Sequence, residues 1–169
     1  MRQAVGKFEK VSFDQFVKGA EKTGFTGDVQ AAYEAIVLPE RATAGSAGYD
    51  FCMPYDIRIA PGQSVLVATG IRVKMDPAYV FLLFPRSSLG FKYRLRLDNT
   101  VGVIDSDYYQ ADNEGHIFAR MTNESDGKML ELSAGQAFMQ GIFVPFGISE
   151  DDDVSTKRTG GFGSTDRKE

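Results

Sequence analysis

Apolar and polar residues alternate through the middle of the chain, which is the pattern of β-strands with one buried face. The alternating apolar positions are Ile57 and Ile59, Val65 and Val67, and Ile71 and Val73. Turn signals at Pro61-Gly62 and Gly70 separate these stretches. The run YVFLLFP, residues 79–85, is continuously apolar and predicts a strand that is buried on both faces. Further strands are predicted over about residues 116–122, 129–132 and 137–144.

The start of the chain has a helical period instead. Ser12 and Gln15 are spaced as in a capping box, in which the first side chain bonds to an amide at the start of a helix. Phe13, Phe16 and Val17 then recur at helical spacing. The sequence therefore predicts a short helix over about residues 12–20, and the segment GAEKTGFTGD that follows is expected to form a loop.

The order of these elements indicates the architecture. Many short strands between turn signals, with almost no helix, are typical of an all-β, jelly-roll-like β-barrel. We expect this barrel over residues 36–148, after an N-terminal extension over residues 1–35 that carries the short helix. The acidic run at 150–153 predicts a solvated linker, so residues 149–169 are expected to be a linker and a flexible, glycine-rich C-terminal arm.

Composition narrows the classes of function. The 169 residues are 43% hydrophobic, which is enough for one sizeable core, and the net charge of −4 disfavours nucleic-acid binding. No apolar run is long enough for a membrane span or a signal peptide, so we expect a soluble, cytoplasmic protein. Because the chain has one cysteine and one histidine, a bound metal would be held by oxygen atoms, which favours Mg²⁺.

Two segments carry groups suited to phosphate chemistry. In PRSSLG, Arg86 offers paired guanidinium donors beside the hydroxyls of Ser87 and Ser88, although a surface turn with an ordinary salt bridge explains these residues equally well. In NTVGVIDSDYY, Asp105 follows an apolar strand and could act on water as a general base. The alternative for Asp105 is an Asx turn, which is the commoner use of Asp-Ser-Asp.

The segment RTGGFGSTD, residues 158–166, has too little apolar surface to pack against a core. Its glycine amides could form a concave group of N–H donors for phosphate oxygens, and Arg158 adds positive charge. The ring of Phe162 could lie over a flat base. We interpret the segment either as a frayed tail or as a lid that a nucleotide orders.

These segments, together with AGSAGYD at 44–50 and GQAFMQGIFVPF at 135–146, resemble in order and approximate spacing the five motifs of the trimeric dUTPase family. The resemblance covers residues 36–166. It implies that family's jelly-roll-like barrel of the β-clip type. It also implies a homotrimer that uses Mg²⁺ to hydrolyse dUTP to dUMP and pyrophosphate, which lowers dUTP and supplies dUMP for thymidylate synthesis.

The resemblance also implies roles for individual residues around the phosphates and the reacting water. Asp105 would orient the attacking water, and Asp50 would support the metal ion through bound water. The residues implied to contact the phosphate chain are Arg86, Ser87, Ser88 and Gln140.

At the nucleoside, the resemblance implies that Asn99 bonds to the uracil edge. Tyr108 would pack against the deoxyribose so that a 2′-hydroxyl would clash. Further substrate contacts are implied for Gly102, Val103, Ile104 and Phe118. The residues of the tail that would close over the nucleotide are Arg158, Phe162, Gly163 and Ser164. In the family the tail reaches the site of another subunit, so that three chains build each active site.

One motif departs from the common family pattern. In DYYQADNEGHI, Gly115 follows Tyr108 by seven residues, which is an insertion of five, and this leaves open which backbone groups meet the uracil. The sole histidine, His116, lies in this hairpin, and strand alternation does not decide whether it faces substrate.

Two other functions stay open from the sequence. A dCTP deaminase on the same fold would need a water-activating glutamate after the hairpin, for which GHIFARMTN offers no convincing equivalent. A non-catalytic regulatory relative would bind nucleotide or protein partners through the N-terminal extension. The presence of Asp105, Arg86 and Phe162 argues against lost chemistry.

Overall fold

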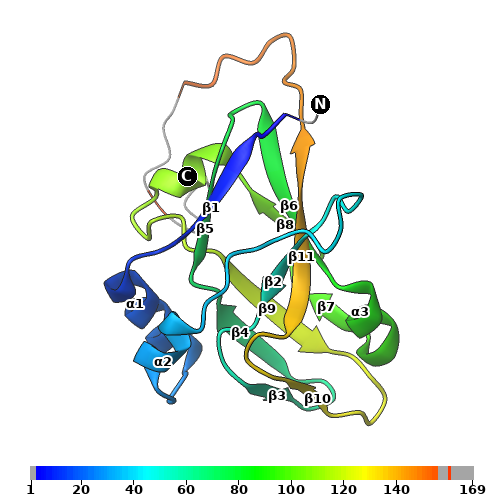
Figure 1. Ribbon diagram of the computed structural model, residues 1–169. Coiled ribbons are helices and arrows are strands. Elements are labelled where there is room, and N and C mark those ends of the chain that lie inside the picture. Colours follow the sequence, from blue (N-terminus) through cyan, green and yellow to red (C-terminus); the bar gives the residue numbers. More distant parts are fainter. Residues whose placement is uncertain (1–2, 156–159, 161–169) are drawn as a thin grey trace, which may run out of the picture.

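The computed structural model describes residues 3–155 and residue 160, and strands make up most of its regular structure (Figure 1). The strands are β1 (Gly6–Lys10), β2 (Tyr49–Cys52), β3 (Ile57–Ile59), β4 (Ser64–Ala68), β5 (Ile71–Met75), β6 (Tyr79–Pro85), β7 (Leu95–Leu97), β8 (Gly102–Ile104), β9 (Phe118–Asn123), β10 (Leu130–Leu132) and β11 (Ala137–Pro145). The helices are α1 (Phe13–Thr23), α2 (Val29–Glu34), α3 (Ser87–Tyr93) and the 3₁₀ helix η1 (Ser106–Gln110).

Within the described residues the strands form small antiparallel sheets around one apolar core. The largest sheet has the order β2-β11-β6-β8, and a second has the order β4-β9-β7. The pairs β1-β5 and β3-β10 complete the arrangement. Phe51, Phe81 and Phe138 are fully or almost fully buried where the sheets meet. This is the all-β, jelly-roll-like fold that the alternating pattern predicted.

The predicted strands are present at β3 to β6 and β9 to β11. β6 differs from the prediction in its burial. Phe81 and Leu83 point into the core, but Leu82 and Phe84 on the other face are only half-buried in the single chain. The continuous apolar run therefore does not reflect a strand that its own chain covers on both faces.

The N-terminal region contains more regular structure than the sequence predicted. The helix expected over 12–20 is α1, which continues to Thr23 because Gly24, at φ 75°, forms a left-handed cap and donates to Ala20 O and Glu21 O. The expected loop GAEKTGFTGD was therefore wrong in its first half. α2 follows at once, with Asp28 accepting a hydrogen bond from the Ala31 amide at 3.0 Å. A six-residue helix with one buried side chain has almost no periodic signal to detect.

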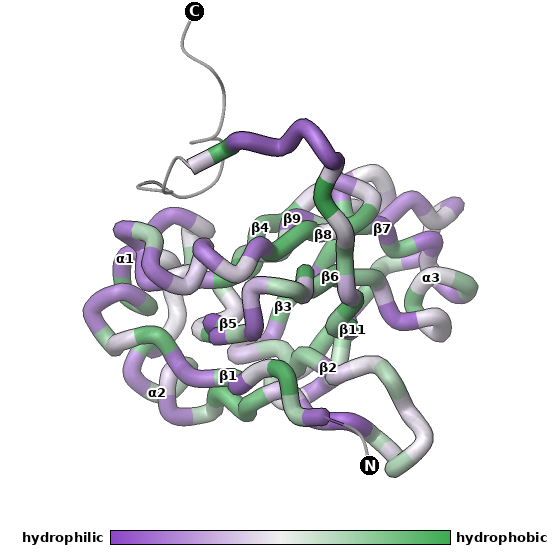
Figure 2. The backbone as a smooth tube through the Cα atoms, turned by 90° about the horizontal axis from the view of Figure 1, so that it is seen from above, coloured by the Kyte–Doolittle hydropathy of each residue, from purple (hydrophilic) through white to green (hydrophobic). Residues whose placement is uncertain are grey.

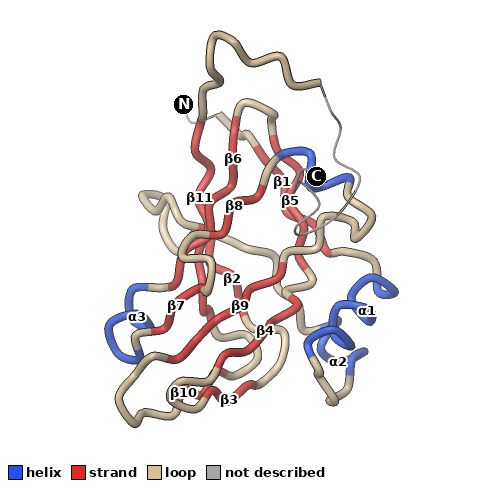
Figure 3. The backbone as a smooth tube through the Cα atoms, turned by 180° about the vertical axis from the view of Figure 1, so that it is seen from behind, coloured by secondary structure: helices blue, strands red, loops and turns tan. Residues whose placement is uncertain are grey.

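The helices lie at the flanks of the sheets. α1 and α2 lie together on one side of the molecule and α3 lies on the other, as views from the front and from behind both show (Figures 1 and 3). The acidic run Glu150–Asp153 is exposed and continues as a hydrophilic stretch away from β11 (Figure 2). None of the described helices has the length and apolar character that crossing a membrane requires.

Candidate active site

An open cleft of about 680 Å³ gathers five of the predicted site residues. These are Asp50, Arg86, Ser87, Ser88 and Gln140. They come from β2, from the end of β6 and the start of α3, and from β11, which are far apart in the sequence. The structure thus brings together the residues that the resemblance implied for the phosphate chain and for the metal.

Strand register explains why these side chains meet. Gln140 on β11 lies opposite Asp50 on β2 and opposite Phe84 on β6, and cross-strand partners point to the same face of a sheet. Gly48, in the segment AGSAGYD, leaves room for the amide: a Cβ added there would lie 2.4 Å from Gln140 Oε1. The absence of a side chain at residue 48 therefore sets where the Gln140 amide can lie.

The cleft contains an ion pair, and exposed serine hydroxyls lie beside it. Arg86 Nε lies 3.5 Å from Asp50 Oδ1, and the two side chains are 39% and 22% exposed. Ser87 and Ser88 are exposed in the first turn of α3, so their hydroxyls can reach a ligand together with the guanidinium. Burial, together with the nearby Asp50 and Glu40 carboxylates, raises the pKa of the Cys52 thiol, so Cys52 is not an activated nucleophile.

A second pocket, of about 370 Å³, contains three of the residues that the resemblance implied for the nucleoside and its surroundings. Asn99, Gly102 and Phe118 line it, together with Leu83 and Met139. Gly102 is required by packing, because a Cβ there would lie 2.9 Å from the Leu83 Cβ on the neighbouring strand. Its absent side chain also leaves this wall of the pocket open.

The two pockets lie on opposite faces of one sheet. Phe84 and Gln140 face the first cleft, whereas the preceding residues Leu83 and Met139 face the second pocket. Successive residues of a strand point to opposite sides, so the sheet separates the two pockets within one chain. The resemblance had implied an active site built from three chains, but the pattern of residues did not indicate which site residues would lie on which face of this sheet.

The remaining predicted residues on β8 and η1 have different environments. Asp105 is exposed and caps η1, where its carbonyl accepts a hydrogen bond from the Tyr108 amide at 3.2 Å. Ile104 is buried and Val103 is 56% exposed on the outer face of the sheet. Tyr108 is 4% exposed, and its hydroxyl donates to His116 O at 2.8 Å. The single chain therefore does not place Tyr108 in either pocket.

Four predicted residues lie outside the described part of the chain. They are Arg158, Phe162, Gly163 and Ser164.

Comparison with known proteins identifies the family. The sequence model of a family described as dUTPase matches residues 34–166. The deoxyuridine 5'-triphosphate nucleotidohydrolase of Lactococcus lactis subsp. lactis (strain IL1403) is 43% identical over 133 residues, which cover 77% of this chain and 88% of that protein. The chain belongs to the dUTPase family.

Solved dUTPase structures have the same fold. The crystal structure of dUTPase from Streptococcus mutans is 40% identical, has a TM-score of 0.64, and covers 85% of this chain and 98% of that chain. A dUTPase mutant from phage phi11 of S. aureus, described with a structural Mg(II) ion, is 21% identical with a TM-score of 0.59. It covers 73% of this chain and 92% of that one, and at this identity the likeness concerns the fold alone.

The family model begins at residue 34, so the residues before it lie outside the matched region, whereas the hairpin before Gly115 lies inside it. His116, which follows the insertion, is fully buried and its Nε2 accepts a hydrogen bond from the Gly70 amide at 2.9 Å. Its ring packs beside Gly19 of α1. In this chain His116 is thus a core residue rather than a ligand in either pocket.

Proposed function

We propose that the protein hydrolyses dUTP to dUMP and pyrophosphate, which lowers dUTP and provides dUMP for thymidylate synthesis. The observation that carries this proposal is the cleft in which Arg86, Ser87, Ser88 and Gln140 converge around the Asp50 carboxylate, in a chain of the dUTPase family. Guanidinium, hydroxyl and amide donors match the oxygens of a triphosphate.

The proposed reaction is an in-line displacement at the α-phosphorus. Asp105 accepts a proton from a water molecule as the water oxygen attacks the α-phosphorus. The bond from that phosphorus to the oxygen bridging to the β-phosphate breaks, and pyrophosphate leaves. Arg86 and the two serines hold the phosphate chain in line, which converts an encounter with water into an oriented attack. Asn99 selects the base, and Tyr108 excludes a ribose.

The donors present fit a magnesium ion held mainly by the substrate. Within the residues that the structure describes, no three His, Cys, Asp or Glu side chains gather as a metal site. Asp50 already pairs with Arg86, so it can offer an oxygen to a bound water without building a cage. Mg²⁺ retains several waters and binds phosphates together with one or two carboxylates, and when bound it would neutralise charge on the phosphate chain.

A homotrimer with shared sites explains the separation of the two pockets. A single nucleotide cannot reach both faces of the β11-β6-β8 sheet in one chain, but the cleft of one chain can meet the nucleoside pocket and Asp105 of another. The outer face of that sheet is suited to association because it carries a patch of apolar side chains. This patch consists of Val80, Leu82, Val103, Ile142 and Val144.

The first experiment tests the reaction. Purified protein is incubated with Mg²⁺ and dUTP, UTP or dCTP, and pyrophosphate and ammonia are measured separately. We expect pyrophosphate from dUTP, little from UTP, and no ammonia from dCTP. Asp105→Asn should lower kcat by about 10²- to 10⁴-fold. The matched variant Asp107→Asn, which alters an exposed carboxylate in the first turn of η1, should retain most activity. Ammonia release from dCTP, or a fully active Asp105→Asn variant, would refute the assignment.

The second experiment tests sharing of the site between chains. Arg86→Ala and Asp105→Asn chains are each expected to be inactive alone. If the cleft of one chain meets Asp105 of another, co-refolded mixtures contain sites with both residues intact, at about a quarter of all sites for random equal mixing. Mixed trimers that form but recover no activity would place both residues in one chain's site.

A further inference from the structure

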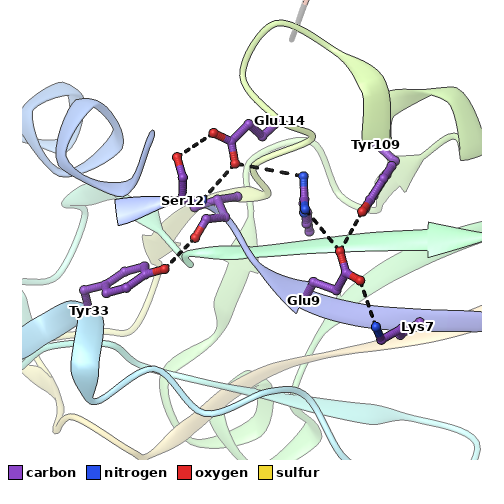
Figure 4. Close-up of polar contacts among 8 residues, drawn as sticks. Lys7, Glu9, Ser12, Tyr33, Tyr109 and Glu114 are labelled. Carbon is purple, nitrogen blue, oxygen red and sulfur yellow. Dashed lines mark hydrogen bonds and ion pairs between the residues drawn. The ribbon is translucent and has the colours of Figure 1, made fainter. Parts of the chain in front are cut away.

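The N-terminal extension, which precedes the residues that the dUTPase family model matches, packs against the hairpin before Gly115 (Figure 4). We use the name N-terminal brace for Glu9, Ser12 and Gly19 together with their respective partners Tyr109, Glu114 and His116. The partners belong to the segment 105–116, which carries Asp105 and Tyr108 at its start. The brace therefore links residues that are about a hundred positions apart in the sequence.

Glu9 is the first connection. Its Oε2 accepts hydrogen bonds from the Tyr109 hydroxyl at 2.6 Å and from Arg72 Nη2 at 3.1 Å, and its Oε1 accepts one from Lys7 at 3.0 Å. The Arg72 guanidinium also lies over the Tyr109 ring, 4.5 Å from its centre. The bonds from Tyr109 and Lys7 hold the pKa of Glu9 at about 2, so the carboxylate is ionised at neutral pH. Charge-assisted bonds of this kind are short and directional.

Glu114 is the second connection. Its carboxylate accepts hydrogen bonds from the Ser12 amide at 2.8 Å and from the Ser12 hydroxyl at 2.5 Å, at the start of α1. It thereby takes the place that Gln15 was expected to fill in a capping box. Glu114 has a φ of 58°, a left-handed conformation that disfavours residues other than glycine and asparagine. The two bonds from Ser12 offset the cost of this unfavourable backbone conformation. We therefore interpret the contact between Glu114 and Ser12 as specific.

The third connection passes through His116 to Tyr108. A Cβ at Gly19 would lie 2.5 Å from the His116 ring, so α1 approaches that ring as closely as a glycine allows. The His116 carbonyl accepts the hydrogen bond of the Tyr108 hydroxyl, and Asn113 Nδ2 donates to the same hydroxyl at 2.7 Å. These bonds fix Tyr108 to the hairpin, and the hairpin in turn contacts the N-terminal extension.

We propose that the N-terminal brace is a positioning device for catalysis: Glu9 and Ser12 hold η1, and through it Asp105 and Tyr108, in the geometry that the reaction needs. This inference rests on the proposed dUTP hydrolysis. Asp105 caps a short 3₁₀ helix of five residues, which has little intrinsic rigidity, so the placement of Asp105 depends on what anchors the helix. Glu9 and Ser12 line neither pocket, so any effect they have on the reaction must pass through the segment 105–116 that they contact.

The first variant removes one oxygen atom from the brace. Tyr109→Phe deletes the bond to Glu9 and leaves the ring beneath Arg72. We expect kcat for dUTP to fall by about three- to tenfold with little change in KM, because displacement of the base by a fraction of an ångström weakens the attack without removing binding groups. UTP hydrolysis should fall less than dUTP hydrolysis, so that discrimination between the two narrows.

The matched control is Tyr33→Phe. It makes the same chemical change in the N-terminal extension, where the Tyr33 hydroxyl donates to Val11 O at 2.8 Å and not to the hairpin (Figure 4). It should leave kcat within about twofold of the wild type. Hydrogen exchange of the amides of residues 105–115 should be faster in Tyr109→Phe and unchanged in Tyr33→Phe.

The second pair of variants separates positioning from stability. Glu114→Gly loses both bonds to Ser12 but relieves the left-handed strain, so its Tm should stay within about 4 °C of the wild type while kcat falls. Glu114→Gln keeps an acceptor for Ser12 and should restore most of kcat.

The proposal would be overturned if Tyr109→Phe and Glu114→Gly both had the kcat of the wild type and its amide exchange rates at residues 105–115. The contacts would then stabilise the fold only. A wild-type protein without dUTP hydrolysis would instead overturn the proposed function, whereas the exchange measurement would still report on the brace.

Discussion

Burial of the sole histidine predicts how the stability of the protein depends on pH, and a substitution at that single residue can test the prediction. His116 is fully buried, its Nε2 accepts from the Gly70 amide, and its Nδ1 has no hydrogen-bond partner among the described residues. Desolvation lowers the pKa of His116 from its ordinary value of 6.5 to about 4, although the Glu114 carboxylate partly opposes the shift. The imidazole is therefore neutral in the folded protein at every pH at which the enzyme is expected to work.

The sign and size of the effect on stability follow from linkage. As pH falls below 6.5 the unfolded chain binds a proton at His116, whereas the folded chain does not until about pH 4. Stability is therefore lost across this window as the pH falls. Each pKa unit corresponds to about 1.4 kcal/mol, so the full shift corresponds to roughly 3 kcal/mol. Between about pH 6 and 5, above the carboxylate range, the expected slope approaches 1.4 kcal/mol per pH unit.

The assay uses the fact that the chain has only one histidine. An NMR titration of the imidazole signals gives its pKa without assignment ambiguity, and we expect no protonation above about pH 5. Denaturant unfolding between pH 7 and 5 gives the slope, and the protein concentration is held fixed so that association between chains contributes equally at each pH. In His116→Gln, which can still accept from Gly70, the slope between pH 6 and 5 should vanish. A titration midpoint near 6.5, or the same slope in the variant, would refute the reasoning.

Two further predictions concern packing and stability. Gly48→Ala places a methyl group 2.4 Å from the present position of Gln140 Oε1, so the amide must turn away. KM for dUTP should then rise by about threefold or more while Tm changes little. An unchanged KM would show that the amide is not needed for binding. Asn123 is fully buried and donates to Ile59 O and Lys128 O at 2.8 Å each. Asn123→Ala should therefore lower the free energy of unfolding by about 2–4 kcal/mol. By contrast Glu131→Gln, which breaks an exposed ion pair with Arg58, should cost less than about 1 kcal/mol in the same denaturant titration, and equal losses for the two variants would contradict this account.

The strands of the barrel, and several residues that line the first cleft, could be predicted from local sequence. Alternation at β3, β4 and β5 reports which face of each strand is buried, and burial of one face is what makes such strands stable. The order of the motifs likewise identified Arg86, Ser87 and Gln140, which the structure brings into one cleft. These features depend on short segments whose side-chain pattern is specific without reference to the rest of the chain.

Other features depend on contacts between distant residues, which a linear pattern does not encode. β1 has a single strongly apolar residue, Phe8, and is a strand because β5 pairs with it. The partner that completes the cap of α1 is Glu114 rather than Gln15, since the hairpin before Gly115 folds back onto the start of the helix. The separation of the first cleft from the second pocket likewise arises from the register of β6 and β11, because a shift of one residue would turn each side chain to the opposite face.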